Sequence, residues 1–340
     1  MIHWDPFSGS EAEWDARISQ AADASPFQSA AWARYKRHQG WKAQRWVATG
    51  DDEEGMPLAC MQTLSRRVPL RLELIWAPGG PVTGYTGSRP EQTGEILSSW
   101  LNGSARDGQA RYVRFFPLSP VSPSAVCALP LGWTRPSQGL GAGYTVELDV
   151  RLTPEERIGA MTRKHRYTLR HALDAGLTWE AGSSANLLRE LVCLHAQMSR
   201  AKRFGLRPED RGSLNALAAA FQDSCLTLIG RHEGRSVTGC LVLLHPPAAF
   251  YWRAATNEEG RAVSAAYAMI LELLENLRVR GITRLDFGGI TPPSARDPGV
   301  SHFKRGFGGR SLEYLGELEW ATSPGWRRAV NFLVRIREGK

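Results

Sequence analysis

At 340 residues, 42% of them hydrophobic, the chain exceeds one average domain and has ample apolar content for packed cores, so we expect two domains. An excess of 42 Lys and Arg over 34 Asp and Glu gives a net charge of +8, which favours anionic partners such as nucleic acid, phosphates or acidic membranes. The five cysteines are scattered without a C-x-x-C pair, which argues against a disulfide framework and a zinc site.

The N-terminal residues and the hydropathy of the chain indicate a cytoplasmic protein. Residues 1–15 are polar and acidic, without the basic start and apolar centre of a signal peptide. No run of residues approaches the ~18 apolar positions that a membrane-spanning helix requires. We therefore expect the protein to work in a reducing cytosol.

Helix and strand signals alternate in the first half of the chain. A helical region over 23–40 ends at Gly40, and a polar turn at 51–55 separates two strand-like runs. The expected strands are 42–49, 57–64, 70–77 and 111–116, with a helix at 93–102. Residues 119–143 are rich in Pro, Ser and Gly, which is typical of a connection, so we expect the first domain to comprise residues 1–143.

The second half follows a similar plan. A strand at 144–150 precedes a helical region at 153–175, where Thr153 and Pro154 form a good N-cap and first helical position. Further helices are expected at 186–201, 213–223 and 263–281, and further strands at 226–231, 237–244, 248–254 and 282–287. A central hairpin followed by strand–helix–strand is the plan of an N-acetyltransferase-like (GNAT-like) fold. The sequence therefore predicts an α/β (α+β) protein with two such domains in tandem.

The C-terminal residues 326–340 predict a basic amphipathic helix. Val330, Leu333 and Ile336 are apolar, and the polar positions are Arg327, Arg328, Arg335 and Arg337. We expect this helix to cover the edge of a core, with contact to nucleic acid as its alternative role.

The stretch from Arg284 to Glu317 contains the most informative motifs. Residues 286–290 read Asp-Phe-Gly-Gly-Ile, so a strand ends on two glycines, where the backbone can turn sharply or approach a ligand closely. The pair Phe303-Lys304 follows, and then a loop with Gly306, Gly308 and Gly309, on which a cation would suit an anionic substrate. Residues 314–317 read Tyr-Leu-Gly-Glu. Together these motifs resemble those of the FemAB (FemX-like) family, aminoacyltransferases that use aminoacyl-tRNA to build peptidoglycan interpeptide bridges.

The resemblance covers nearly the whole chain and implies the compact form of the family. That form has tandem GNAT-like domains, here residues 1–143 and 144–318, without a coiled-coil arm, and a C-terminal helix (319–340) that packs back on the first domain. It implies transfer of Gly, Ala or Ser from aminoacyl-tRNA to an amine of a UDP-muropeptide or a lipid-linked peptidoglycan precursor. The implied partners are these two substrates and, transiently, the membrane surface; no cofactor and no metal is implied.

Lys304 is the first candidate for catalysis, with Phe303 beside it. Aminoacyl transfer passes through a tetrahedral oxyanion, and a fixed cation stabilises that charge more than it stabilises the ester. An attacking lysine amine would need a base, because its ordinary pKa is ~10.4. Asp286 is near in sequence, but an Asp before Gly-Gly is more simply explained as a turn former.

Binding residues follow from the same resemblance. Lys36 and Arg207 would contact the phosphates of the acceptor, the arginine through its bidentate fork. Arg211 and Arg253 replace aromatic residues at groove positions of the family, and Phe116 replaces an acidic one. These replacements leave a secondary-metabolite amine open as an alternative acceptor.

A run of cations at the start of the second domain resembles a basic helix of the family. Four cations fall within about two turns, namely Arg163, Lys164, Arg166 and Arg170. We predict that they contact the phosphate backbone of tRNA. A solvated helix face balanced by nearby acidic residues is the alternative.

Residues 138–143 spell Q-x-x-G-x-G, the pattern with which acetyltransferases bind the pyrophosphate of CoA. That pattern should leave a strand and open a helix, whereas here a strand is expected after it. An acyl-CoA-dependent N-acyltransferase is therefore a disfavoured alternative. A catalytically silent module that binds tRNA or muropeptide is another, and the presence of Phe303-Lys304 argues against it.

Overall fold

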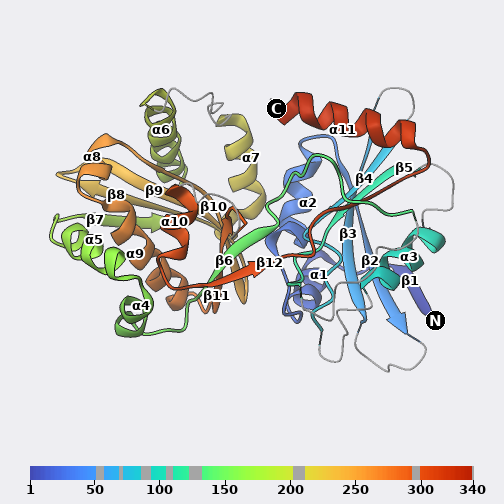
Figure 1. The fold of residues 1–340 in the computed structure, drawn as a ribbon, viewed down its shortest axis with the longest axis horizontal. Coiled ribbons are helices and arrows are strands. Elements are labelled where there is room, and N and C mark those ends of the chain that lie inside the picture. Colours follow the sequence, from blue (N-terminus) through green and yellow to red (C-terminus); the bar gives the residue numbers. More distant parts are fainter. Residues whose placement is uncertain are drawn as a thin grey trace. The chain divides into compact units, whose positions relative to one another are not determined.

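The computed structural model describes residues 1–50, 57–68, 72–85, 93–104, 110–121, 132–201, 211–292 and 299–338. Contacts within the chain divide it into two compact units, Met1–Tyr144 together with Leu312–Lys340, and Thr145–Ser311. Each unit is built on its own sheet with flanking helices (Figure 1). The domain boundaries expected at 143/144 and 318/319 stay a prediction, and the contact-based division assigns residues from Leu312 onward to the first unit.

The first unit contains a sheet with the strand order β1-β2-β3-β4-β5-β13. Its strands are β1 (Ile2–Pro6), β2 (Lys42–Gly50), β3 (Ala59–Val68), β4 (Leu72–Pro78), β5 (Ala110–Phe116) and β13 (Leu318–Ala321). Its helices are α1 (Glu11–Ile18), the 3-10 turn η1 (Pro26–Gln28), α2 (Ala30–Arg37), α3 (Thr93–Ser104) and α11 (Pro324–Glu338). Only β4 and β5 pair in parallel, and α3 lies in the crossover that a parallel pair requires.

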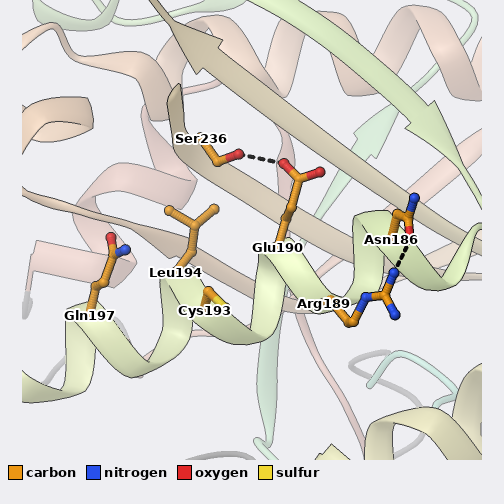
Figure 2. Close-up of a pocket in the computed structure, with 7 residues that line it drawn as sticks. All are labelled: Asn186, Arg189, Glu190, Cys193, Leu194, Gln197 and Ser236. Atoms are coloured by element: carbon orange, nitrogen blue, oxygen red, sulfur yellow. Dashed lines mark hydrogen bonds between the residues drawn. The ribbon is translucent and has the colours of Figure 1, made fainter. Parts of the chain in front are cut away.

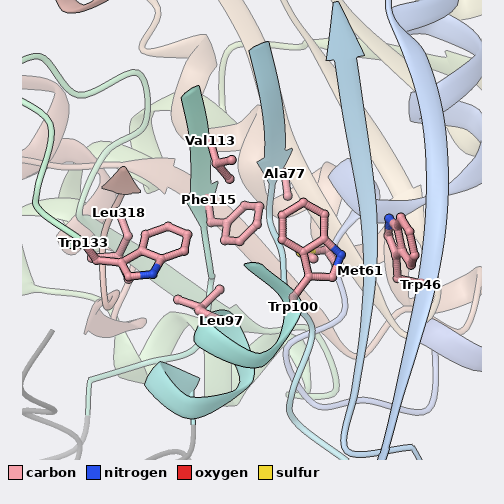
Figure 3. Close-up of a cluster of buried hydrophobic side chains, with 9 residues drawn as sticks. All are labelled: Trp46, Met61, Ala77, Leu97, Trp100, Val113, Phe115, Trp133 and Leu318. Carbon is pink, nitrogen blue, oxygen red and sulfur yellow. The ribbon is translucent and has the colours of Figure 1, made fainter. Parts of the chain in front are cut away.

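Large aromatic side chains fill the core between α3 and this sheet (Figure 3). Trp100 of α3 meets Phe115 of β5 edge to face, with ring centroids 5.3 Å apart. Trp133 lies on the other side of Phe115 at 5.3 Å, and Leu318 of β13 joins the same cluster. Burial of these rings is the main term that stabilises the unit.

A buried glutamine joins the segment before α2 to the sheet. The Gln28 side-chain amide donates to the carbonyls of Gln62 (3.2 Å) and Pro78 (2.8 Å), and its oxygen accepts from the Gln62 amide (2.6 Å). A Cβ on Gly80 would lie 2.7 Å from this side chain, so glycine is needed for the close approach. Gln28 thus fixes the segment before α2 against β3 and the end of β4.

A buried ion pair connects β5 to the segment before β13. Arg114 and Glu317 are 3% and 4% exposed at their side chains, and the arginine also donates to the carbonyl of Gln138. The other carboxylate oxygen of Glu317 accepts from the amides of Leu140 (2.6 Å) and Gly141. The amides of the Q-x-x-G-x-G stretch are therefore bound by a carboxylate of the same chain.

Replacing Glu317 by Gln should lower the free energy of unfolding by about 3–5 kcal/mol, because Arg114 would remain buried without its counter-charge. The matched control is Glu313→Gln, at an exposed glutamate that accepts from the Tyr144 hydroxyl, where we expect a change within about 1 kcal/mol. Denaturant unfolding of both variants measures the difference. Equal midpoints would show that the buried pair does not hold this unit together.

The second unit contains a sheet with the strand order β12-β6-β11-β10-β9-β8-β7. Its strands are β6 (Tyr144–Asp149), β7 (Thr178–Gly182), β8 (Cys225–His232), β9 (Arg235–His245), β10 (Ala248–Thr256), β11 (Arg284–Gly289) and β12 (Arg310–Glu313). Its helices are α4 (Pro154–Ala160), α5 (Arg163–Leu173), α6 (Ala185–Ala201), α7 (Arg211–Phe221), the turn η5 (Gln222–Ser224), α8 (Glu258–Ala262), α9 (Ala265–Val279) and α10 (Gly299–Arg305). Strands β10 and β11 are parallel, with α8 and α9 in their crossover.

Helices α6 and α9 cover opposite faces of this sheet. A Cβ on Gly239 of β9 would point at Leu191 of α6, whereas the neighbouring Thr238 donates to Met269 of α9. Adjacent residues of a strand point to opposite faces of the sheet, so α6 and α9 cover opposite faces. Both units therefore share one plan, in which a hairpin leads into a parallel pair joined by helix.

Several elements differ from the sequence prediction. The helix expected over 153–175 is interrupted, because Met161 and Thr162 are extended and Thr162 caps a new helix, α5. The strands β1, β7, β12 and β13 and the helices α1, α8 and α10 were not predicted. Among the described residues, no helix combines the length and apolar character needed to cross a bilayer.

Candidate functional site

Lys304 lies where the two parallel strands of the second unit stop pairing. Strands β10 and β11 pair only as far as Phe250 and Asp286, although both continue beyond. Helix α10 places the Lys304 ammonium against the end of β11, where it donates to the Gly289 carbonyl at 2.9 Å. The ammonium also lies 5.8 Å from the centroid of the Phe287 ring.

The double glycine at the end of β11 makes room for this ammonium. Gly288 has φ +78°, and a Cβ there would lie 3.3 Å from Lys304 Nζ and 3.3 Å from the Tyr251 carbonyl oxygen. Asp286 forms the turn, as expected: its Oδ1 accepts from the Gly288 amide at 2.8 Å and from the Thr145 hydroxyl. That oxygen is therefore engaged and is a poor candidate for a general base.

Burial changes the ionisation of Lys304. Removal from water lowers the pKa of the ammonium from 10.5 to about 8, and the nearby Asp286 carboxylate opposes this shift. The side chain is thus positively charged at neutral pH. An ammonium carries three N–H donors, so Lys304 can hold Gly289 and still donate to a ligand.

A buried histidine holds the helix that carries Lys304. The His165 side chain of α5 is 0% exposed, and its Nε2 lies 2.9 Å from the carbonyl oxygen of Phe303. Its Nδ1 lies 3.0 Å from the Thr162 hydroxyl. The amide of Thr162 donates to the Gly306 carbonyl at 3.0 Å, which adds a second connection between the start of α5 and the end of α10.

The three loop glycines serve packing, which corrects their interpretation as the lining of a ligand site. A Cβ on Gly306 would lie 1.9 Å from the His165 ring, and one on Gly308 would lie 2.2 Å from the Ala160 carbonyl oxygen. A Cβ on Gly309 would lie 2.6 Å from the Glu147 carbonyl oxygen. Each glycine therefore lets two segments of the unit approach closely.

Phe303 packs against aromatic side chains of its own unit. Its ring meets Tyr267 of α9 at 5.1 Å and Phe307 at 5.0 Å, both edge to face. Phe287 and His165 complete this aromatic cluster. The contacts explain how Phe303 anchors α10, while its catalytic role stays a prediction.

The residues predicted to bind the acceptor belong to both units. Lys36 belongs to the first unit, where its ammonium lies 4.8 Å from the Trp32 ring, 5.4 Å from the Trp76 ring and 2.9 Å from Gln39 Oε1. Arg253 is exposed on β10, 5.0 Å from the Trp252 ring. Arg207 and the side chain of Arg211 lie outside the described residues.

The predicted tRNA-binding cations share α5. Arg163, Lys164 and Arg170 are exposed, whereas Arg166 is partly buried and donates to the carbonyls of Met161 and Gly159 at the end of α4. Arg166 thus satisfies carbonyl groups of a helix end, as basic residues commonly do. The other three remain candidates for contact with nucleic acid.

His165 is the residue of this region that the sequence did not single out. It stands among the α5 cations but shares the buried face of that helix with Leu169 and Ala172. The spacing of His165 and Leu169, four residues apart, is the one available signal. By residue type alone, His165 is not separated from the exposed His171 of the same helix.

A separate cavity of about 380 Å³ lies beside α6 (Figure 2). It is lined by Asn186, Arg189, Glu190, Cys193, Leu194, Gln197 and Ser236. The Glu190 carboxylate accepts from Arg231 at 2.8 Å and from the Ser236 hydroxyl. Because α6 covers the sheet face opposite α9, while Phe303 packs on α9, this cavity is distinct from the Lys304 site.

Within the described residues, one group of side chains has the spacing of metal ligands, namely His232, Glu233 and Glu259. Arg235 donates to Glu259 at 3.1 Å and lies 3.5 Å from Glu233. The arginine supplies the positive charge that a cation would otherwise bring. The cluster is therefore explained as a surface ion-pair network.

Comparisons with known proteins agree with these motifs. A family model described as the FemAB family matches residues 225–334, which include Lys304. A lipid II:glycine glycyltransferase of Staphylococcus saprophyticus is 23% identical over 401 aligned residues, which cover 96% of this chain and 95% of that protein. A protein of the same name from Staphylococcus epidermidis is 22% identical, covering 91% of each. The resemblance to the FemAB family is confirmed.

Solved structures show the same fold. The crystal structure of FemX superposes with a TM-score of 0.80 at 17% identity, covering 96% of this chain and all of FemX (100%). A tandem GNAT protein from the clavulanic acid pathway gives a TM-score of 0.52 at 11% identity, covering 95% and 99%. The prediction of a FemX-like α/β fold with tandem GNAT-like halves is confirmed.

Replacing Gly306 by Ala should displace the His165 ring and with it the helix of Lys304. We expect about 1–3 kcal/mol of lost stability from overpacking, and at temperatures where the variant stays folded a fall of about tenfold to hundredfold in any transfer activity that depends on Lys304. The matched control is Gly159→Ala in α4, whose Cβ would meet no heavy atom within 4 Å. Thermal unfolding and single-turnover transfer measure the two effects. A Gly306→Ala variant that behaves like the control would contradict the role of the imidazole contact.

Proposed function

We propose that the protein is a peptidoglycan aminoacyltransferase that moves Gly, Ala or Ser from aminoacyl-tRNA to an amine of a UDP-muropeptide or lipid-linked precursor. The observation that carries this proposal is the Lys304 ammonium, fixed by Gly289 where β10 and β11 separate. The lipid II:glycine glycyltransferases that resemble the chain over nearly its full length support the choice of acceptor class.

In the proposed reaction the acceptor amine attacks the ester carbonyl carbon of the aminoacyl-tRNA. A C–N bond forms, and the carbonyl electrons move onto oxygen to give a tetrahedral oxyanion beside Lys304. The ammonium stabilises this charge more strongly than the neutral ester, since the site is partly desolvated. The C–O bond to the ribose then breaks, and the proton lost by the amine ends on the ribose hydroxyl that leaves.

The other predicted residues would hold the substrates. The exposed α5 cations Arg163, Lys164 and Arg170 are suited to the phosphates of tRNA. Lys36 and Arg253 would bind the acceptor, and Arg207 and Arg211 are assigned to it by the family resemblance alone. Lys36 is held against aromatic rings, which limits the side-chain entropy lost when it binds a phosphate.

The acyl-CoA alternative is disfavoured by the first unit. The amides of Leu140 and Gly141, which would have to face a pyrophosphate, donate to the buried Glu317 carboxylate. A CoA phosphate would have to displace that carboxylate and leave Arg114 to rearrange. A metabolite amine as acceptor is tested by the same transfer assay.

We expect labelled amino acid to move from glycyl-, alanyl- or seryl-tRNA to a UDP-muropeptide or a detergent-solubilised lipid-linked muropeptide. The transfer should be abolished by ribonuclease and unaffected by removal of CoA. A comparison of the two acceptors identifies which carrier is used. Folded protein that transfers no label to either acceptor would overturn the cell-wall assignment, and label that reaches only a small-molecule amine would replace the acceptor class.

Lys304 should make the reaction sensitive to alkaline pH. Because its pKa is about 8, the ammonium is lost as the pH rises through that value, and turnover should fall there. Lys304→Arg should move this fall to higher pH, and Lys304→Met should lower turnover about 10²- to 10³-fold at neutral pH. Lys36→Met is the contrasting variant, for which we expect a higher KM for the acceptor and an unchanged alkaline fall.

The Lys304→Met substitution also has a testable effect on stability. The folded pKa of Lys304 lies below its ordinary value of 10.5, so burying the ammonium is a cost that is fully present below about pH 8 and fades as the pH rises toward 10.5. Lys304→Met should therefore be more stable than the wild type at pH 7, and the difference should shrink at high pH. An inactive and less stable Lys304→Met would instead indicate a structural lysine.

A further inference from the structure

Helix α11 is attached to the first unit by one side. Val330 is 4% exposed and packs with Tyr112 of β5. Asn331 donates to the buried Glu319 carboxylate of β13 at 2.8 Å, and the Tyr112 hydroxyl donates to the same oxygen at 2.6 Å. These contacts fix the rotation of the helix about its axis.

The opposite side of α11 presents large apolar side chains to solvent. Phe332 is 63% exposed, Leu333 is 54% exposed and Ile336 is 58% exposed. This corrects the expectation that Leu333 and Ile336 share a buried face with Val330. At 100° per residue, Phe332, Ile336, Leu333 and the exposed Ala329 form one stripe that is about as wide as a buried helix face.

Arginines flank this apolar stripe. Arg328 and Arg335 are exposed and stand four residues before and three residues after Phe332, along one edge of the stripe. The helix Pro324–Glu338 also includes Arg327, which lies 3.6 Å from Glu319 and faces the sheet. An exposed apolar stripe bordered by cations therefore projects away from the attached side.

We propose that this face of α11 docks the protein on the surface of an anionic bilayer. The apolar side chains would enter the boundary between headgroups and acyl chains, and the arginines would bind lipid phosphates. Nucleic acid fits this face less well, because Phe332 could stack on a base but Leu333 and Ile336 would stay exposed beside the phosphates. Helix α5 shows the contrast, since its cations surround Tyr167, 75% exposed, while the exposed Leu173 (55%) stands at its last position.

The test is flotation of the full chain with vesicles, without tRNA or muropeptide, so that docking is measured independently of the proposed activity. Wild-type protein should bind phosphatidylglycerol-containing vesicles and should be released by high salt, while vesicles of phosphatidylcholine alone should bind it weakly. Phe332→Ser with Ile336→Ser should lower the partition coefficient at least about tenfold. Arg328→Gln should lower it about fivefold.

The matched control is Val279→Ser at the end of α9, which removes an apolar side chain of 73% exposure and should leave vesicle binding unchanged. Transfer to a soluble UDP-muropeptide should also be unchanged in the double serine variant. Equal flotation of wild type and the double variant would overturn the proposal. Self-association of the wild type that the double serine variant loses would also overturn it and would assign the face to a second copy. A loss of RNA binding in the double serine variant would overturn it as well and would assign the face to tRNA.

Discussion

A buried imidazole that contacts the backbone one residue before Lys304 is a central constraint on where that lysine lies. Helix α10 spans only Gly299–Arg305, too short to be stable by itself, so its position has to come from its neighbours. Burial lowers the pKa of His165 and keeps the ring neutral near pH 7, and a neutral ring has one donor nitrogen. Since the Phe303 carbonyl can only accept, Nε2 carries the proton and Nδ1 accepts from Thr162.

This arrangement separates two uses of glycine that look alike in the sequence. Gly288 lets the Lys304 ammonium reach the end of β11, and this ammonium is the group that would act on substrate. Gly306 gives the His165 imidazole access to the end of α10, where it packs inside the unit. A motif that alternates Gly with other residues therefore does not by itself identify a ligand site, because the same property also permits dense packing.

Elements whose evidence is local could be predicted from the sequence, and elements that depend on distant partners could not. Strand β9 contains the apolar run Cys240–Leu244 and α9 repeats apolar residues at helical spacing, so both were expected near their observed positions. Strand β13 has four residues and forms by pairing with β5, whose Phe115 stands opposite Leu318. For the site, resemblance pointed to Lys304, but its contact with Gly289, its lowered pKa and the support from His165 needed three dimensions.

The basic character of the chain is explained better by what surrounds each cation than by net charge. On α5 the exposed Arg163 and Lys164 border Tyr167, a side chain that can stack on a base, and on α11 Arg328 and Arg335 border Phe332 and Ile336. Surface cations attract any polyanion from a distance in a similar way. The contact that forms after this attraction depends on whether the side chains beside the cations suit a nucleic-acid base or a lipid acyl chain. In the proposed reaction and docking, the excess of +8 charges would serve an RNA donor and a lipid surface through separate helices, each selected by its uncharged residues.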